Sequence, residues 1–542
     1  MWNRSIWDGY VAHKGTANDL GITNPRPFIL SRSAGAGIQR YGVAIWSGDI
    51  PSRLEALATH GNAQMHMSFS GIDYYGADVG GFRRETMPDN DENGRYRGFE
   101  QEIFTQWLAN AAWFDVPIRP HTDNQFKPVH DYQTAPNLVG KIDSNLANLR
   151  QRYELVPYYY SLAHLANETG APLIPPAVFY YQDDPNLRGM GNEKMIGRDL
   201  LVGMVAGHGE YARNVYLPAG RWADYLSHEW VRSSGQFVAD IPEYRGGIFR
   251  LPVFARAGAI LPKMPIDADT EDTFGHRKPG APARDELIVR VYADPIPSDF
   301  TLYEDDGLTV RYDDTGRPSY NHRITRITQS MSGAATAIVR VDPAVDSDAG
   351  RPYNGAPAGR PNVIELVVEE AKATGVSLNG TPLTQRSDRA AFDAAPSGWI
   401  NADHGLVLAK SERLPVATAK EFTFSLIPDA GASSVYFACE NGATHQGQSV
   451  FIAGSIPELG GWNPTKALKL EPNIYYQYIA DGHRGTPIWT RVVSLPTNTE
   501  FEWKCLRLAD DASGPADWQP GANNSFKTEG HPGYAGAARG RF

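Results

Sequence analysis

The pattern of apolar positions divides the chain into an α/β part and a longer β-rich part. In residues 1–182, short apolar runs alternate with segments in which apolar residues recur at helical spacing, as they do from Phe99 to Ala111. The apolar runs have the length of buried strands and cover residues 27–30, 41–46 and 72–78. Repeated alternation of strand and helix is typical of a parallel α/β barrel or a doubly wound sheet. We therefore predict a parallel sheet in this part of the chain.

Polar residues lie at or just after the end of each of these predicted strands. Arg32 and Asp49 come just after an apolar run, and Asp78 comes at the end of the third run. In a parallel barrel, the residues at the carboxyl ends of the strands build the active site. The three side chains are therefore candidates for one site.

After residue 182 the helical spacing stops and short strands separated by Gly and Pro turns take over. We predict a proximal β domain at residues 183–262 and a distal β domain at residues 263–415. A linker is expected near residue 415. The remaining residues, 419–542, have the size of one small β-sandwich.

Composition narrows the possible partners. The chain has 542 residues, too many for one core, and a formal net charge of −11 without a run of Lys or Arg. Nucleic acid and anionic membranes are therefore not expected partners. We see neither an apolar run long enough for a membrane helix nor a signal peptide at the N-terminus. No cofactor or metal is expected, and whether Cys439 and Cys505 form a bridge stays open.

Several motifs in a fixed order carry a family resemblance. They are Arg-Pro-Phe-Ile-Leu-Ser-Arg-Ser at 26–33, Trp-Ser-Gly-Asp at 46–49, Asp-Val-Gly-Gly-Phe at 78–82, Arg-Pro-His at 119–121 and the segments 149–160, 215–222 and 252–262. In this order they resemble glycoside hydrolase family 31, which contains retaining α-glucosidases, α-xylosidases and related transglucosylases. The resemblance implies an incomplete (β/α)8 barrel, its C-terminal half, at residues 1–182, followed by two all-β domains.

The resemblance identifies Asp49 as the general acid/base. Cleavage of a glycosidic bond needs a protonated acid at the leaving oxygen and later a base for water. Taken alone, an Asp that follows Gly48 is more typical of a turn. Trp46 is expected to exclude water from Asp49, and burial would raise the pKa of this carboxyl. Arg32 is expected to hydrogen-bond the hydroxyls of the glucose at the non-reducing end.

Further sugar contacts follow from the same resemblance. His121 would hydrogen-bond the same glucose, with Phe82 and Trp46 as apolar walls. Asp78 is expected to orient Arg32 or the nucleophile, and Arg119 is expected to lie in the same group of residues.

The second carboxylate of a retaining mechanism has no clear candidate. In the family the nucleophile lies on an earlier barrel strand, in a Trp-x-Asp-x-x-Glu-like segment, and only 25 residues precede Arg26. Asp8 lies in a predicted helix and lacks the following Glu. We therefore expect a fragment of the barrel that is inactive by itself.

The C-terminal part resembles a family 20 carbohydrate-binding module, the starch-binding domain. The motifs are residues 450–464, 501–506 and 517–519, followed by Asn523-Asn524. The resemblance implies that Trp462 and Trp518 stack on glucose rings while Lys504 and Asn523 bind hydroxyls. Two core Trp in a sandwich are the alternative. Tyr475, with Tyr476 beside it, falls where a second site has its aromatic residue.

The main functional hypothesis is an α-glucosidase-type hydrolase that acts on starch, maltodextrin or related α-glucans. An α-transglucosylase and a catalytically silent starch-binding protein are the alternatives. The starch-binding module suggests an extracellular or periplasmic location.

Overall fold

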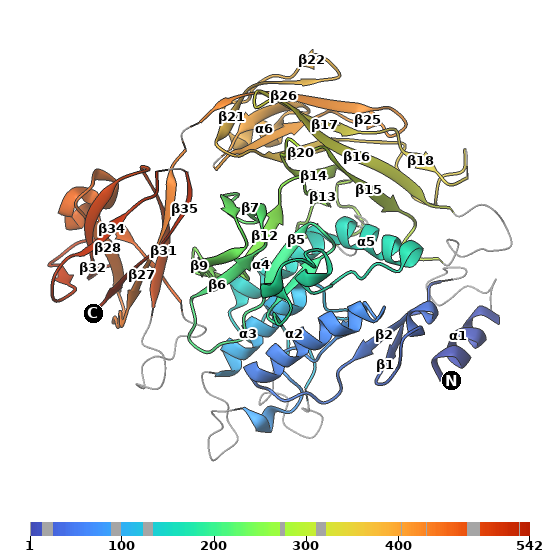
Figure 1. Cartoon of the computed structure of the whole chain (residues 1–542), viewed down its shortest axis with the longest axis horizontal. Coiled ribbons are helices and arrows are strands. Elements are labelled where there is room, and N and C mark those ends of the chain that lie inside the picture. The colour runs from blue at the N-terminus through green and yellow to red at the C-terminus, as the bar shows by residue number, and fades with distance from the viewer. Residues whose placement is uncertain are drawn as a thin grey trace.

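The computed structural model describes residues 2–12, 25–87, 99–122, 134–270, 277–309, 321–348, 350–402, 404–429, 431–473, 488–530 and 532–542. The proximal β domain lies at the centre of Figure 1. The α/β part lies below it and to the right, the distal β domain above it, and the C-terminal module to its left. This arrangement confirms the predicted multidomain, β-rich architecture. No helix among the described residues has the length and apolarity to cross a bilayer.

The α/β part contains a parallel sheet of three strands in the order β1-β2-β3, within the described residues. Its strands are β1 (Ile29–Ser31), β2 (Val43–Trp46) and β3 (Tyr75–Gly76). Its helices are α1 (Trp2–Ala12), α2 (Leu54–Phe69), α3 (Phe99–Ala112), α4 (Ile142–Glu154) and α5 (Val156–Thr169). Strand β2, helix α2 and strand β3 form a βαβ unit, as the alternating pattern predicts. A closed barrel has eight strands, so the three strands of this sheet correspond to part of one, with β1 at an edge of the sheet among the described residues.

Helix α5 fixes the α/β part to the two β domains beside it. The Tyr158 side chain is fully buried, and its hydroxyl donates a hydrogen bond to the carbonyl of Ile196 at 2.9 Å. The Ser161 hydroxyl accepts a hydrogen bond from the backbone N–H of Tyr303 at 3.0 Å. One hydrophobic core therefore runs from the helices into the proximal sheet.

The proximal β domain is built on a five-stranded sheet in the order β4-β5-β12-β7-β8. These strands are β4 (Glu193–Ile196), β5 (Leu200–Gly203), β12 (Val253–Arg256), β7 (Gly220–Asp224) and β8 (Trp230–Ser233). Two short pairs complete it: β6 (Ala212–Leu217) with β9 (Gln236–Pro242), and β10 (Tyr244–Arg245) with β11 (Ile248–Phe249).

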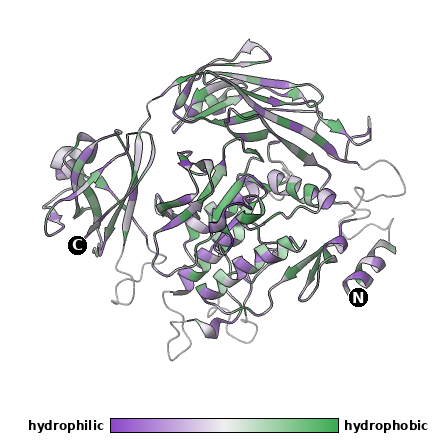
Figure 2. Cartoon of the chain, viewed as in Figure 1, coloured by the Kyte–Doolittle hydropathy of each residue, from purple (hydrophilic) through white to green (hydrophobic). Residues whose placement is uncertain are grey.

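The distal β domain packs two sheets over one apolar core. The five-stranded sheet contains β13 (Ile260–Lys263), β14 (Leu287–Tyr292), β20 (Asn362–Val367), β24 (Leu406–Lys410) and β23 (Gly398–Asn401). The seven-stranded sheet contains β15 (Ser298–Glu304), β16 (Arg323–Ser332), β17 (Thr336–Val341), β26 (Lys420–Pro428), β21 (Ala371–Leu378), β22 (Thr381–Pro382) and β18 (Val345–Asp346). Strands β19 (Gly359–Arg360) and β25 (Leu414–Pro415) pair separately, and α6 (Arg389–Ala394) contacts β23. Green apolar segments alternate with purple polar ones along these strands in Figure 2.

One predicted domain boundary is wrong, and the other falls within a strand. Strand β13 pairs with β14, so the distal domain begins before residue 263. Strand β26 pairs with β17 and β21, so the distal domain continues to Pro428. The expected linker near residue 415 is strand β25. Alternation of buried Phe422, Phe424 and Leu426 with polar residues makes β26 a strand of the distal core.

The C-terminal module is a sandwich of two sheets. One sheet has the order β30-β31-β27-β35: β30 (Glu471–Pro472), β31 (Trp489–Leu495), β27 (Ser433–Glu440) and β35 (Gly533–Arg541). The other contains β29 (Leu468–Lys469), β28 (Gln448–Gly454), β32 (Glu500–Ala509), β33 (Asp517–Trp518) and β34 (Asn524–Lys527). A disulfide between Cys439 on β27 and Cys505 on β32 connects the two sheets through the core, which answers the open question about these cysteines.

Candidate active site and starch-binding site

The predicted catalytic side chains meet at the carboxyl ends of the three parallel strands. Arg32 directly follows β1, Asp49 lies three residues after the end of β2, and Asp78 lies two residues after the end of β3. An isolated parallel bridge between Asp78 and Arg119 brings the segment before His121 alongside. The sequence thus predicted both the edge of the sheet and the residues found there.

Asp78 is the buried centre of this group. Its carboxylate accepts hydrogen bonds from Arg119 Nη1 at 2.8 Å and from Trp46 Nε1 at 3.3 Å. Burial raises the pKa of Asp78 to about 6, with a smaller upward contribution from Asp49, while Arg119 and the indole N–H of Trp46 lower it. Asp78 therefore fixes the positions of Trp46 and Arg119 rather than contacting Arg32.

Two guanidinium groups approach the ring of Trp46. The guanidinium carbons of Arg32 and Arg119 lie 5.0 Å and 4.6 Å from the ring centroid, within the range of cation–π attraction. Arg32 Nη2 lies 3.7 Å from Asp49 Oδ1. Trp46 thus links the buried Asp78 to the more exposed pair of Arg32 and Asp49.

One expectation about this site is wrong. Trp46 was expected to exclude water from Asp49, but the Asp49 side chain is 42% exposed and that of Arg32 is 63% exposed. The indole N–H of Trp46 faces Asp78 instead. The buried carboxyl with a raised pKa is therefore Asp78.

The loops after β2 and β3 are held together by their backbones. Phe82 N–H donates to the carbonyl of Ile50 at 2.8 Å. A Cβ on Gly81 would lie 2.5 Å from the Cα of Ser52, so this close approach requires glycine. The ring of Phe82, predicted as an apolar wall, lies 5.3 Å from the ring of His121. Burial and the nearby Arg119 lower the pKa of His121.

Arg84 supports these loops and was not identified from the sequence. Its side chain is fully buried, and it donates hydrogen bonds to Thr122 Oγ1 at 3.0 Å and to Glu100 Oε1 at 3.1 Å. Thr122 in turn donates to the carbonyl of Phe82 at 2.9 Å. In the sequence, Arg84 stands out only by its position two residues after Phe82. That position does not show which of the adjacent Arg83 and Arg84 is buried, and Arg83 is the exposed one.

Asp8, which lacks the following Glu expected beside the nucleophile, lies on α1. Its carboxylate is 59% exposed and lies 3.4 Å from Arg4 on the same helix. Among the described residues, no group of three or more His, Cys, Asp or Glu is arranged to hold a metal ion.

The two tryptophans of the module form one surface. Trp462 ends a 3-10 helix, η8 (Pro457–Trp462), and its ring centroid lies 6.1 Å from that of Trp518 on β33. Both side chains are half-buried rather than part of the core. A Cβ on Gly460 would lie 2.8 Å from the carbonyl oxygen of Lys466, so this turn requires glycine.

The predicted polar partners, Lys504 and Asn523, hydrogen-bond to groups of the module itself around the loop that follows Trp518. Lys504 Nζ donates to the carbonyls of Gln519 at 3.1 Å and Gly521 at 2.6 Å. Asn523 Nδ2 donates to Glu502 Oε2 at 2.9 Å. Tyr475 and Tyr476 lie outside the described residues.

Comparison with known protein families agrees with this geometry. Residues 1–162 match the glycosyl hydrolases family 31 TIM-barrel domain, and residues 170–261 match the glycosyl hydrolase family 31 C-terminal domain. Residues 432–534 match the starch binding domain of family CBM 20. The chain therefore combines a glycoside hydrolase barrel portion with a carbohydrate-binding module. Residues 1–162 and 170–261 are thus similar to two consecutive domains of glycosyl hydrolase family 31.

Curated relatives include enzymes with different reactions. The chain is 30% identical over 311 residues to alpha-glucosidase 2 of Bacillus thermoamyloliquefaciens, an alignment covering 56% of this chain and 34% of the relative. It is 27% identical over 381 residues to an isomaltosyltransferase of Sporosarcina globispora, covering 68% and 30% respectively. The chain thus spans about a third of the length of these relatives.

Solved structures share the fold. A Flavobacterium johnsoniae GH31 dextranase superposes with a TM-score of 0.60 at 21% identity, covering 78% of this chain and 48% of the dextranase. A cycloalternan-forming enzyme from Listeria monocytogenes gives 0.57 at 19% identity, covering 92% and 43%.

Proposed function

We propose that this chain binds α-glucans such as starch and maltodextrin, and that it carries the acid/base part of a retaining α-glucosidase-type active site. The observation that carries the proposal is the convergence of Arg32, Trp46, Asp49 and His121 at the carboxyl end of one parallel sheet. The paired indoles of the module supply a second glucan surface.

Asp49 suits proton transfer to a bound sugar because its carboxyl is reachable from solvent. In the proposed step it donates a proton to the glycosidic oxygen as the bond breaks and later accepts a proton from water. Arg32 and His121 would bind the sugar hydroxyls, and the rings of Trp46 and Phe82 would contact the C–H faces of the glucose.

A retaining reaction also needs a nucleophile about 5–5.5 Å from the acid. The neighbouring carboxyl, Asp78, is fully buried and hydrogen-bonded to Arg119 and Trp46, so it is not free to attack a sugar. This observation favours the second candidate function, a catalytically silent starch-binding protein. A transglucosylase remains the third candidate, supported by the relatives that transfer sugars.

We also propose a location in an oxidising compartment, outside the cytoplasm. The Cys439–Cys505 disulfide supports this location, since such bonds persist in secreted and periplasmic proteins. Starch granules and dextrins would be met there as external substrates.

One experiment separates the three candidates. The purified chain is incubated with granular starch and, separately, with maltose, and adsorption, free glucose and longer oligosaccharides are measured. Glucose release that is lost in Asp49→Asn supports a hydrolase, and longer products support a transglucosylase. Adsorption without turnover supports a silent binding protein, and absence of adsorption contradicts the α-glucan assignment.

A further inference from the structure

Strand β27 of the C-terminal module is buried on both faces. Alternate side chains of a strand point to opposite sides of the sheet. Val435, Phe437 and Cys439 point into the core of the module. Ser434 and Ala438 belong to the other face and are also buried, at 1% and 0% exposure. A sandwich attached only through a flexible linker would expose that second face to water.

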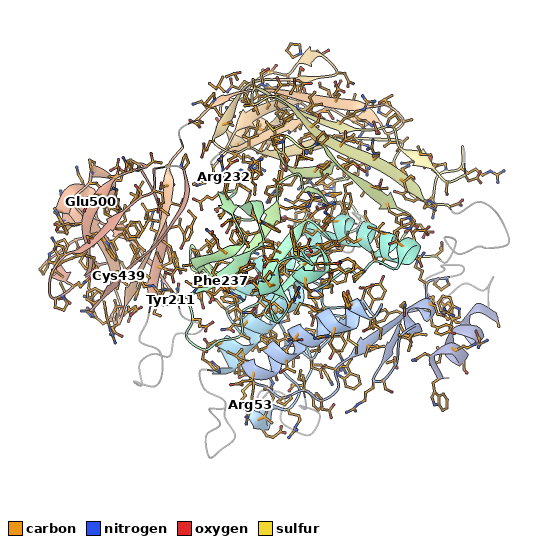
Figure 3. All side chains as sticks on the ribbon, in the orientation of Figure 1. Arg53, Tyr211, Arg232, Phe237, Cys439 and Glu500 are labelled. Carbon is orange, nitrogen blue, oxygen red and sulfur yellow. A yellow bond between two sulfur atoms is a disulfide. The ribbon has the colours of Figure 1, made fainter. Side chains whose placement is uncertain are left out.

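The proximal β domain covers this second face. The Tyr436 hydroxyl donates a hydrogen bond to the backbone carbonyl of Tyr211 at 3.1 Å, and the two rings are 6.4 Å apart. The Tyr211 hydroxyl donates to Glu440 Oε1, at the end of β27, at 2.8 Å. Figure 3 shows Tyr211 where the module meets the proximal β domain.

The neighbouring strand β35 extends the contact. The Tyr534 hydroxyl donates to the backbone carbonyl of Asp240, and its ring packs against the apolar cluster of the proximal domain. Arg539 forms an ion pair with Asp240 and lies 5.4 Å from the centroid of the Tyr211 ring. A Cβ on Gly533 would lie 3.0 Å from the carbonyl oxygen of Trp230, so the two backbones approach closely.

The glucan-binding residues belong to the opposite side of the module. Trp518 lies on β33, which belongs to the other sheet of the module and not to the sheet of β27 and β35. Trp462 follows β28 of that same other sheet. In Figure 1 this second sheet, with β28, β32 and β34, lies on the outer side of the module, away from β6 and β9.

We propose that the β27–β35 face of the module is a permanent docking surface for the proximal β domain. The starch-binding module is then a fixed part of the molecule rather than a tethered one. It holds its glucan surface outward, at a constant orientation to the strands that carry Arg32 and Asp49. In a protein with a flexible linker, a binding module samples the volume around the active site, which sets its effective concentration there. A docked module does not sample that volume, so its orientation to the active site sets its effect instead.

Small-angle X-ray scattering of the full chain tests this proposal. We expect the wild-type curve to match one rigid arrangement of the described domains. Tyr211→Ala combined with Arg539→Glu removes the covering ring and reverses the charge opposite Asp240, so the radius of gyration should increase. Lys527→Glu, an equal charge reversal on exposed β34 of the opposite sheet, should leave the curve unchanged.

Starch adsorption provides the independent readout. Because Trp462 and Trp518 lie away from the docking face, adsorption by the double variant should stay within about twofold of wild type. A wild-type scattering curve that can be fitted only by an ensemble with many positions of the module would by itself overturn the proposal. An unchanged curve for the folded double variant would overturn the assignment of the surface. Neither result would affect the proposed glucan-binding function, which the adsorption assay tests separately.

Discussion

Arg119 donates a hydrogen bond to the buried carboxylate of Asp78 across 2.8 Å. This contact anchors Trp46 from one side, and Trp46 in turn contacts Arg32. The buried carboxylate of Asp78 therefore positions Trp46 and Arg119 at the candidate active site. Arg119 is 27% exposed, so the pair is only partly screened by water.

Replacing this carboxylate should weaken the fold locally. Asp78→Ala leaves the guanidinium of Arg119 and the indole N–H of Trp46 without their acceptor, and we expect a loss of about 1–3 kcal/mol in the free energy of unfolding. Urea unfolding measures it. Asp8→Ala, which removes an exposed carboxylate on α1, is the control and should change stability by less than about 0.5 kcal/mol. Equal effects of the two substitutions would contradict the anchoring role.

The two indoles of the module should dominate binding to starch. Loss of one aromatic stacking surface costs about 0.5–1.5 kcal/mol beyond area burial, so Trp462→Ala and Trp518→Ala should each weaken binding of β-cyclodextrin up to roughly tenfold. Calorimetric titration of the full chain gives the constants. Trp2→Ala, at an exposed position on α1, is the matched control. Unchanged binding in both module variants would exclude this surface as the glucan site.

The chain should adsorb to starch granules without releasing glucose from maltose. The exposed pair of Arg32 and Asp49 is 3.7 Å apart, and β1 beside it is an edge strand in the described sheet. Misplacement of catalytic groups by about 1 Å can cost 100-fold in rate. A coupled glucose assay measures turnover. Glucose release at a rate comparable to that of a family member would contradict this prediction and direct the search to another carboxylate, Asp8 first.

In any preparation of this chain that does release glucose, Asp49→Asn should abolish turnover of maltose. An amide cannot donate the proton that an alkoxide leaving group needs. An aryl glucoside with an activated leaving group should lose less in the first step. Initial rates on both substrates measure the difference, and circular dichroism checks the fold. Near-normal maltose turnover in Asp49→Asn would assign Asp49 to a turn.

Glu243 should make stability fall as pH rises. Its carboxyl is fully buried between β9 and β10, and neither oxygen has a hydrogen-bond partner among the described residues. Burial, with a contribution from Glu210, raises its pKa to about 8. The folded state therefore keeps a proton that the unfolded chain releases near its ordinary pKa, and the free energy of unfolding decreases from about pH 4.5 up to pH 8.

Glu243→Gln should remove this part of the pH dependence. Urea unfolding at intervals from pH 5 to pH 8.5 measures the slope for both proteins. Glu500→Gln, at an exposed position of β32, is the control and should keep the wild-type slope. An identical slope in Glu243→Gln would show that another group titrates.

The sequence was most informative where chemistry is concentrated in short motifs. Arg32, Asp49 and Asp78 could be placed at strand ends because apolar runs of strand length precede them. It was least informative about pairings between distant segments. Nothing near Lys420 shows that β26 lies between β17 and β21 in the distal sheet, since an alternating strand fits a sheet of either domain.

The same limit explains the error at Asp49. Whether a carboxyl is buried depends on neighbours from other strands, and the indole of Trp46 turns toward Asp78 instead. Arg84 was missed because its partners, Glu100 and Thr122, are brought to it by the fold and lie at no regular spacing.

The disulfide between Cys439 and Cys505 gives the module a mechanical property. Cys439 lies on the strand that contacts the proximal domain, and Cys505 lies on the strand next to β33, which carries Trp518. If the outer sheet binds a starch granule as proposed, a pull on it reaches the inner sheet through a covalent bond as well as through apolar packing. The disulfide joins the sheet that carries Trp518 to the sheet that contacts the proximal domain. It therefore resists sliding of one sheet over the other even when the apolar core is strained.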